Sequence, residues 1–254
     1  MNVAVFNSKP ELAQAAAETA THIIRQVIAE RGQAYLIAAT GASQFEFLDV
    51  LTSQQDIDWA QTTFFHLDEY VGLPATHPAS FRKYLKERIV DRVRPGAFNF
   101  VNGDDANPVG ECQRIGDLIS RQTIDAAFVG IGENGHLAFN DPPADFQTQE
   151  PYLVLELDQA CRRQQVGEGW FESVADVPQQ AISMSIQQIL KARNVLCIVP
   201  DRRKAKAVRD TLELAVSPLR PASILQHHPR TTIYLDMESA ALLEPRRATQ
   251  SPNI

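Results

Sequence analysis

The sequence has few cysteines and no long apolar run. Its three cysteines, Cys112, Cys161 and Cys197, are widely separated, odd in number and without C-x-x-C spacing. Such a set predicts reduced, mostly buried thiols rather than a disulfide framework. No apolar stretch reaches membrane-spanning length, and the first residues, MNVAVFNSKPELAQ, lack the basic and apolar regions of a secretory signal. We therefore expect a soluble cytoplasmic protein.

Positive charge is also scarce. The chain carries 24 Lys and Arg residues against 31 Asp and Glu residues, a formal net charge of −7. A surface of this sign disfavours nucleic acid and anionic membranes. Of the 254 residues, 44% are hydrophobic and 22% charged, as in ordinary globular proteins with a sizeable core. We expect a single domain, residues 1–254, whose partner is a small molecule.

Short apolar runs alternate with helical patterns along the chain. Residues 10–32 have apolar side chains at helical spacing and end at Gly32, and residues 201–215 predict a helix with Asp201 as its N-cap. The predicted buried strands are residues 34–40, 62–68, 126–132, 194–200 and 231–236. This alternation predicts an α/β fold, a mainly parallel sheet with helices on both faces. Residues 144–183 are the least regular, and we expect them to form a lid or insertion.

Polar residues follow several of these predicted strands. Ligands of open α/β sheets bind beyond the carboxyl ends of the strands, where loops from different strands converge. We therefore expect one site built from Thr40–Ser43, His66, Asp68–Tyr70, Gly132–His136 and Asp201–Lys204.

The loop after the third predicted strand contains a formal G-x-G-x-x-G pattern at Gly130, Gly132 and Gly135. A dinucleotide-binding loop opens directly into a helix whose N-terminus faces the pyrophosphate. Here HLAFNDPP follows, and Pro142 and Pro143 would stop a helix within two turns. The pattern therefore does not predict a dinucleotide cofactor.

The loop Thr40, Gly41, Ala42 and Ser43 has the small residues and hydroxyls that suit a phosphate. A helix beginning at Ser43 would add backbone N–H groups and its dipole. The alternative is a plain strand-to-helix turn in which Ser43 is the N-cap.

The only dense basic cluster, PDRRKAKAVR, lies at residues 200–209. Lys204 is expected in the first turn of its helix, where a cation opposes the dipole unless it shares an anion with the helix N-terminus. The alternative is a solvated basic face, which is what we expect for Arg202, Arg203 and Lys206.

Two further segments carry candidates for proton transfer. Asp68 follows a very apolar run, where burial raises the pKa of a carboxyl group toward that of a general base; a helix cap is the alternative. His66 alternates with Asp68, but no metal-ligand spacing accompanies it, so we expect no metal. His136 follows the glycine turn, and Asp141 can orient its imidazole; the alternative is a surface histidine.

Taken together, these segments resemble the glucosamine-6-phosphate deaminase family, within the wider group that includes 6-phosphogluconolactonases. The matching stretches are LDEYVGLPATHPASF (67–81), GIGENGHLAFNDPP (130–143) and PASILQHHP (221–229). The resemblance implies a modified Rossmann-like fold and conversion of glucosamine 6-phosphate to fructose 6-phosphate and ammonia, with no cofactor. The resemblance therefore also implies that the protein is a hydrolase, a deaminase and an isomerase of amino-sugar metabolism.

The resemblance also implies roles for individual residues. Asp68 matches the base that moves a proton between C2 and C1 of the opened sugar, and His136 matches the histidine that assists ring opening. Lys204 and the loop from Thr40 to Ser43 match the phosphate site.

Three positions depart from the family pattern. Asn134 stands where the family has Asp, and Asp141 stands where it commonly has Glu; both belong to the expected catalytic group. The family's phosphate-binding arginine has no clean match, although Arg162 or Arg163 could replace it. The sequence leaves three alternatives open: another hexosamine 6-phosphate such as the galacto epimer, a 6-phosphogluconolactonase-like hydrolase, and a non-catalytic sugar-phosphate-binding regulator.

Allosteric members of the family use basic residues after the histidine loop, at a position that corresponds here to residues 144–157. This stretch contains no Lys or Arg. A phosphate site between subunits without cations would have little to offset desolvation of the anion. We expect a non-allosteric protein of low or moderate oligomeric state, with homo-oligomers compatible with the sequence.

Overall fold

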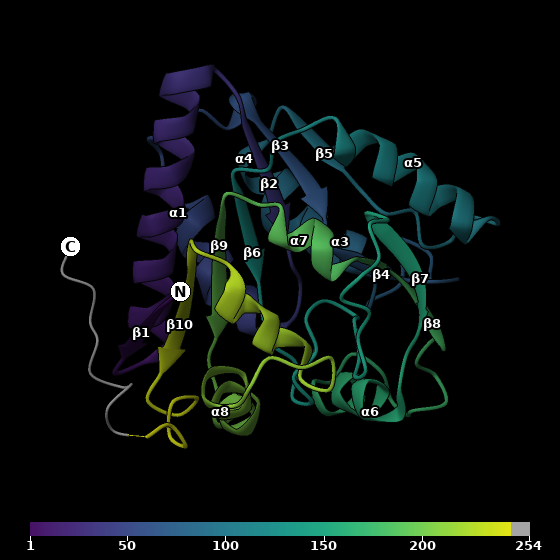
Figure 1. Ribbon diagram of the computed structural model, residues 1–254. Helices are drawn as coiled ribbons and strands as arrows, with labels where there is room; N and C mark the ends of the chain where they lie inside the picture. The colour runs from purple at the N-terminus through teal and green to yellow at the C-terminus, as the bar shows by residue number, and fades with distance from the viewer. Residues whose placement is uncertain (245–254) are drawn as a thin grey trace.

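The structure is a computed structural model that describes residues 1–244. Its centre is a seven-stranded sheet of order β1-β10-β9-β6-β2-β3-β5, in which every neighbouring pair is parallel (Figure 1). The strands are β1 (Asn2–Phe6), β2 (Ala34–Ala38), β3 (Thr62–His66), β5 (Ala97–Asn99), β6 (Ala126–Val129), β9 (Asn194–Val199) and β10 (Thr231–Asp236). This sheet and its helices confirm the predicted α/β fold.

Helices cover both faces of the large sheet because its strand residues are apolar on both sides. In β2, Leu36 packs in the cluster that contains α1 and α2, whereas its neighbour Ile37 packs in the cluster that contains α5 and α8. The helices are α1 (Lys9–Arg31), α2 (Phe45–Thr52), α3 (Phe81–Leu85), α4 (Asp91–Val93), α5 (Pro108–Ser120), α6 (Gln159–Gly167), α7 (Ile186–Leu190) and α8 (Ala205–Glu213). Among residues 1–244, no helix is both long and apolar enough to cross a membrane.

Helix α1 ends at Gly32, as the sequence predicted, and begins after a cap at Ser8. The hydroxyl oxygen of Ser8 accepts a hydrogen bond from the amide of Glu11, and Gly32 ends the helix in the left-handed conformation at φ 75°. Glycine adopts that conformation without steric cost.

A second, three-stranded antiparallel sheet of order β4-β8-β7 lies beside the large one (Figure 1). Its strands are β4 (Asp68–Tyr70), β7 (Tyr152–Glu156) and β8 (Gln180–Met184). The region expected to be irregular, residues 144–183, therefore supplies most of this sheet as well as α6. Whether it moves as a lid stays a prediction.

The chain passes from one sheet to the other through a single residue, Leu67. The amide of Leu67 donates to the carbonyl oxygen of Ala38 in β2 at 3.2 Å. Its carbonyl oxygen accepts from the amide of Met184 in β8 at 2.9 Å. Asp68, the next residue, therefore lies at the junction of the two sheets.

Both predicted helix starts, at Ser43 and at Asp201, are 3-10 turns in the structure, and Asp201 takes the N-cap position of its turn. Ser43 lies inside a 3-10 turn, Ala42–Gln44, and Asp201 precedes another, Arg202–Lys204; neither side chain caps a helix. Each turn is closed by its own backbone, for example by the amide of Lys204 donating to the carbonyl oxygen of Asp201 at 3.0 Å.

Candidate active site

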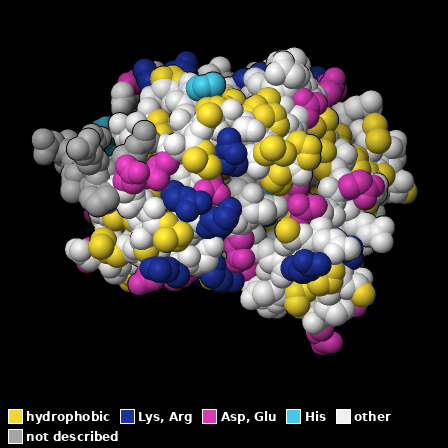
Figure 2. Space-filling model, turned by 60° about the horizontal axis from the view of Figure 1, so that its bottom comes forward, with side chains coloured by type: hydrophobic (Ala, Val, Ile, Leu, Met, Phe, Trp, Pro, Cys, Tyr) yellow, Lys and Arg dark blue, Asp and Glu magenta, His cyan; other side chains and the backbone are white. Residues whose placement is uncertain are grey.

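A cavity opens at the carboxyl ends of β2, β3, β6 and β9, which is the edge that the sequence predicted. This edge faces the bottom of Figure 1, where α6 and α8 lie, and Figure 2 turns it toward the viewer. Basic side chains gather there next to acidic ones (Figure 2). The cavity is lined by Ala39, Thr40, Gly41, Ala42, Ser43, Leu67, Asp68, Phe81, Gly130, Ile131, Gly132, His136, Ala138, Phe139, Gln164, Gln165, Glu168 and Lys204.

Asp68 is one of two carboxylates that line this cavity within residues 1–244, and it lies at the junction of the sheets. It is only 5% exposed. Burial, with a further contribution from the charge of Glu69, raises the pKa of Asp68 to about 8. A carboxyl group with such a pKa can accept and return a proton near neutral pH, as a general base requires.

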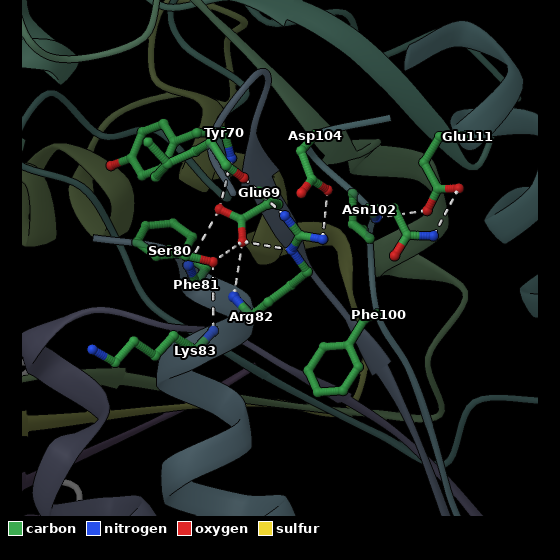
Figure 3. A network of polar contacts seen from close by, with 12 residues as sticks. Glu69, Tyr70, Ser80, Phe81, Arg82, Lys83, Phe100, Asn102, Asp104 and Glu111 are labelled. Atoms are coloured by element: carbon green, nitrogen blue, oxygen red, sulfur yellow. Dashed lines mark hydrogen bonds and ion pairs between the residues drawn. The ribbon is translucent and has the colours of Figure 1, made fainter. Parts of the chain in front are cut away.

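The neighbouring Glu69 does not line the cavity, and its carboxylate is held in a network of polar contacts (Figure 3). Its carboxylate accepts hydrogen bonds from the amides of Tyr70, Phe81 and Arg82 and from the hydroxyl of Ser80. The guanidinium of Arg82 lies 3.5 Å from the same carboxylate. Because Ser80 also caps helix α3, this network joins the strand of Asp68 to that helix.

His136 lines the cavity with Asp141 and Asn134 behind it. Nδ1 of His136 lies 3.1 Å from Oδ1 of Asp141, and the amide of His136 donates to Oδ1 of Asn134 at 3.0 Å. Burial raises the pKa of Asp141, but the contacts with His136 and Asn134 outweigh it and leave this pKa below its ordinary value. Asp141 is therefore a carboxylate that can orient the imidazole, while His136 is the member of the group that reaches the cavity.

Gly132 explains part of the glycine pattern. A Cβ at this position would lie 2.2 to 2.4 Å from atoms of the His136 ring. Only glycine leaves room for the imidazole in this arrangement. No helix follows the loop: residues 130–151 contain turns and bends, and the next helix is α6. The structure thus confirms that no helix opens directly from this loop, which is the feature that a dinucleotide-binding loop requires.

The loop 40–43 and Lys204 lie at the same end of the cavity. Gly41 has φ 98°, and its carbonyl oxygen accepts a hydrogen bond of 3.0 Å from the hydroxyl of Tyr84 in α3. Lys204 is 5% exposed, and burial lowers its pKa from the ordinary value, while the charge of Glu168 opposes this shift. A buried ammonium beside a loop of small residues is suited to an anion.

Several predicted site residues lie elsewhere. His66 is fully buried and away from the cavity; its Nδ1 accepts from the amide of Val101, and burial together with the charge of Arg82 lowers its pKa to about 3. Tyr70 does not line the cavity either, and its hydroxyl donates to Gln165, which does. The physical reason is the change of sheet at Leu67, which breaks the strand that was predicted to run from 62 to 68.

The two arginines considered as phosphate contacts also point away from the cavity. Arg162 donates to the carbonyl oxygen of Val177 at 3.0 Å, and Arg163 donates to Gln159 on the exposed side of α6. Lys204 is the cation among the described residues that line the cavity. Gln164, Gln165 and Glu168, which do line it, were missed because nothing in the local sequence distinguishes them.

One group of side chains has the atom types of a metal site. His136, Asp141 and Cys161 offer ligand atoms within 4.8 Å of one another. Burial, followed by the charge of Asp141, raises the pKa of the Cys161 thiol. Asp141 also accepts from Asn134 and from the amide of Asp158. These contacts suit a carboxylate that holds a histidine.

Comparison with known proteins gives the family. The sequence model of the family described as glucosamine-6-phosphate isomerases/6-phosphogluconolactonase matches residues 7–234. The chain belongs to this family. The family model and the relatives described next confirm the resemblance noted from the sequence.

Three members of the family are particularly informative. A glucosamine-6-phosphate deaminase of Bacillus cytotoxicus is 33% identical over 95% of this chain and 89% of its own length. One of Streptococcus pneumoniae is 35% identical over 89% of this chain and 94% of its own length. A solved structure of a monomeric glucosamine-6-phosphate deaminase superposes with a TM-score of 0.87 at 31% identity, covering 95% of this chain and all of that chain (100%).

These relatives correct one expectation. The sequence placed the reaction among hydrolases as well as among deaminases and isomerases. The assignment to hydrolases is wrong, because both relatives and the solved structure are named as deaminases.

Proposed function

We propose that this protein converts glucosamine 6-phosphate to fructose 6-phosphate and ammonia by aldose–ketose isomerisation followed by deamination. The observation that carries the proposal is the placement of Asp68, His136 and Lys204 around one cavity. A general base, an oriented imidazole and a buried cation are the three groups that this reaction needs. The names of the relatives support the same reaction.

Ring opening is the first step of the proposed mechanism. Nδ1 of His136 faces Asp141, which leaves Nε2 for the sugar. A proton leaves the C1 hydroxyl while another reaches the ring oxygen, so the C1–O5 bond breaks and the aldehyde forms. An imidazole held by a carboxylate can shuttle this proton near neutral pH.

Asp68 carries out the isomerisation. Its carboxylate takes the proton from C2 while the substrate's ammonium group gives a proton to O1, which yields an enolamine; Asp68 then returns its proton to C1. The product has a C2 imine and a C1 hydroxymethyl group. Water then adds to C2, the C2–N bond breaks, and ammonia leaves with the C2 carbonyl of the ketose in place. The substrate's own carbonyl and amine supply the reactivity, so we propose that no cofactor takes part.

The phosphate end of the substrate is assigned to Lys204 and to the loop Thr40, Gly41, Ala42 and Ser43. Anchoring the phosphate there places the sugar carbons between Asp68 and His136. Asn134 and Asp141 lie behind the histidine and are assigned a positioning role, since they contact His136 rather than line the cavity.

The test is a panel of hexosamine 6-phosphates assayed for both ammonia and ketose 6-phosphate. We expect glucosamine 6-phosphate to give the two products in equal amounts. Ketose without ammonia would instead identify an isomerase, and binding without either product would identify a sugar-phosphate-binding regulator. Faster turnover of the galacto epimer would reassign the substrate.

A further inference from the structure

The phosphate end of the cavity contains a carboxylate as well as a lysine. Glu168 directly follows α6, and one of its carboxylate oxygens lies 3.8 Å from Nζ of Lys204. The side chains of Glu168 and Lys204 are only 7% and 6% exposed, so the pair is shielded from solvent. Lys204 therefore already has a counter-ion before any substrate binds.

Glu168 is held in this position by neighbouring donors. Gln164 Nε2 donates to Oε1 at 2.8 Å, and the indole N–H of Trp170 donates to Oε2 at 3.2 Å. Oε1 is the oxygen that lies near Lys204, whereas Oε2 faces the loop 40–43, since a Cβ on Gly41 would lie 4.0 Å from it. The carboxylate thus lies between Lys204 and the loop 40–43, the two parts of the proposed phosphate site.

We propose that Glu168 is a specificity-determining residue that weakens the binding of phosphorylated sugars and so reduces the preference for them over sugars without a phosphate. This inference rests on the proposed function, because it concerns the phosphate end of the same cavity. A phosphate entering this end either displaces the carboxylate from Lys204 or lies beside it. Displacement breaks the existing ion pair between Glu168 and Lys204. A phosphate beside the carboxylate places two negative charges together in a buried site.

A neutral side chain at position 168 removes both costs. Glu168→Gln keeps the size of the side chain, and Glu168→Ala removes the carboxylate with little demand on the local backbone, which is helical at this position. In either variant Lys204 keeps its charge and is free to pair with the phosphate. The affinity for an anion should therefore rise, whereas the affinity for an uncharged sugar should not.

Glu133 provides a matched control. Its carboxylate also acts on Lys204 electrostatically, but it lies 3.5 Å from Arg203, is 36% exposed and does not line the cavity. Glu133→Gln removes the same unit of charge from a solvated position. Solvent and salt screen such a charge strongly.

The experiment measures dissociation constants of glucitol 6-phosphate, inorganic phosphate and glucitol, the matched uncharged sugar, by titration calorimetry, with the melting temperature of each variant as a check on folding. We expect Glu168→Gln and Glu168→Ala to bind the two phosphate ligands on the order of tenfold more tightly than the wild type, while the affinity for uncharged glucitol changes by less than about twofold. Glu133→Gln should change all three by less than about twofold.

Unchanged or weaker phosphate binding in both folded Glu168 variants would overturn the inference. An equal gain in Glu133→Gln would also overturn it, because the effect would then be one of overall charge. Glucitol 6-phosphate cannot react, so the result does not depend on turnover. Absence of ammonia from glucosamine 6-phosphate would count against the proposed function alone.

Discussion

Nδ2 of Asn134 donates a hydrogen bond of 3.0 Å to Oδ1 of Asp141. The same carboxylate oxygen lies 3.1 Å from Nδ1 of His136, and Oδ1 of Asn134 accepts from the amide of His136. One neutral side chain therefore holds both the histidine and its carboxylate. This is one of the positions at which the sequence departs from the pattern of the family it resembles.

Replacement of Asn134 by alanine removes both hydrogen bonds. We expect Asn134→Ala to lower the free energy of unfolding by about 1 to 3 kcal/mol, because two partly buried partners lose a hydrogen bond. The turnover number should fall more than KM rises, since His136 loses its orientation while the phosphate end is untouched. Urea denaturation and steady-state kinetics measure the two effects. Wild-type turnover in a folded Asn134→Ala protein would show that the histidine is oriented without Asn134.

Asp68→Asn tests the proton-transfer base. The substitution preserves shape but removes the basic carboxylate, so substrate affinity should be retained. The turnover number should fall by at least about two orders of magnitude, the usual scale for loss of a general base. Rapid-quench assays of ketose formation and equilibrium binding of glucitol 6-phosphate check the two parts. Near-normal turnover with a shifted melting temperature would indicate a structural role instead.

The raised pKa of Asp68 predicts an opposite pH dependence for activity and for stability. Because the carboxylate is the active form, kcat/KM should rise with pH up to about 8, where Asp68 titrates. The folded-state pKa lies above the ordinary value of 3.8, so the stability that Asp68 contributes is fully present below that value and is lost as the pH rises toward 8.

The variant Asp68→Asn is the control for that stability effect. It should be more stable than the wild type at pH 8, and the difference should shrink as the pH is lowered to 4. Urea midpoints at several pH values provide the measurement. A difference that is constant with pH would contradict a raised pKa at Asp68.

Lys204→Ala tests the phosphate end. Removal of the ammonium leaves Glu168 without its counter-ion beside the phosphate, so KM for glucosamine 6-phosphate should rise by at least about thirtyfold. Lys206→Ala, at a lysine whose side chain is 73% exposed and paired with Asp210, should leave KM nearly unchanged. Steady-state kinetics of both variants give the comparison. An unchanged KM in Lys204→Ala would contradict the assignment.

Kinetics without allostery are the last prediction. Residues 144–157 offer no cation for an effector phosphate, so saturation curves for glucosamine 6-phosphate should be hyperbolic. Addition of N-acetylglucosamine 6-phosphate should not change their shape. Sigmoidal curves that become hyperbolic with this compound would show that cations from elsewhere in the chain form an effector site.

The large sheet and much of the cavity could be predicted from the sequence. Strands buried on both faces are continuous apolar runs, and loops after parallel strands meet at one edge, so the convergence of Asp68, His136 and Lys204 followed from their positions alone. The resemblance to a family added the roles proposed for them.

The parts that were missed depend on contacts between distant segments. His66 and Asp68 alternate in sequence as though on one strand face, but the chain changes sheets at Leu67 and separates them. Strand β5 has only three residues, too few for a pattern. Glu168 belongs to the site because folding brings it next to Lys204, and the residues around it in the sequence do not predict that contact.

The single-residue passage through Leu67 has a consequence for how reactions diverge in this architecture. The large sheet carries the loops to which we assign the phosphate and the loop of His136, whereas the small sheet carries Asp68, the proposed proton acceptor. A slight rotation of one sheet against the other would change the reach of Asp68 toward an anchored ligand without altering either set of binding contacts. Proteins that share this fold can therefore keep the same contacts with a ligand while the atom of the ligand that Asp68 reaches changes.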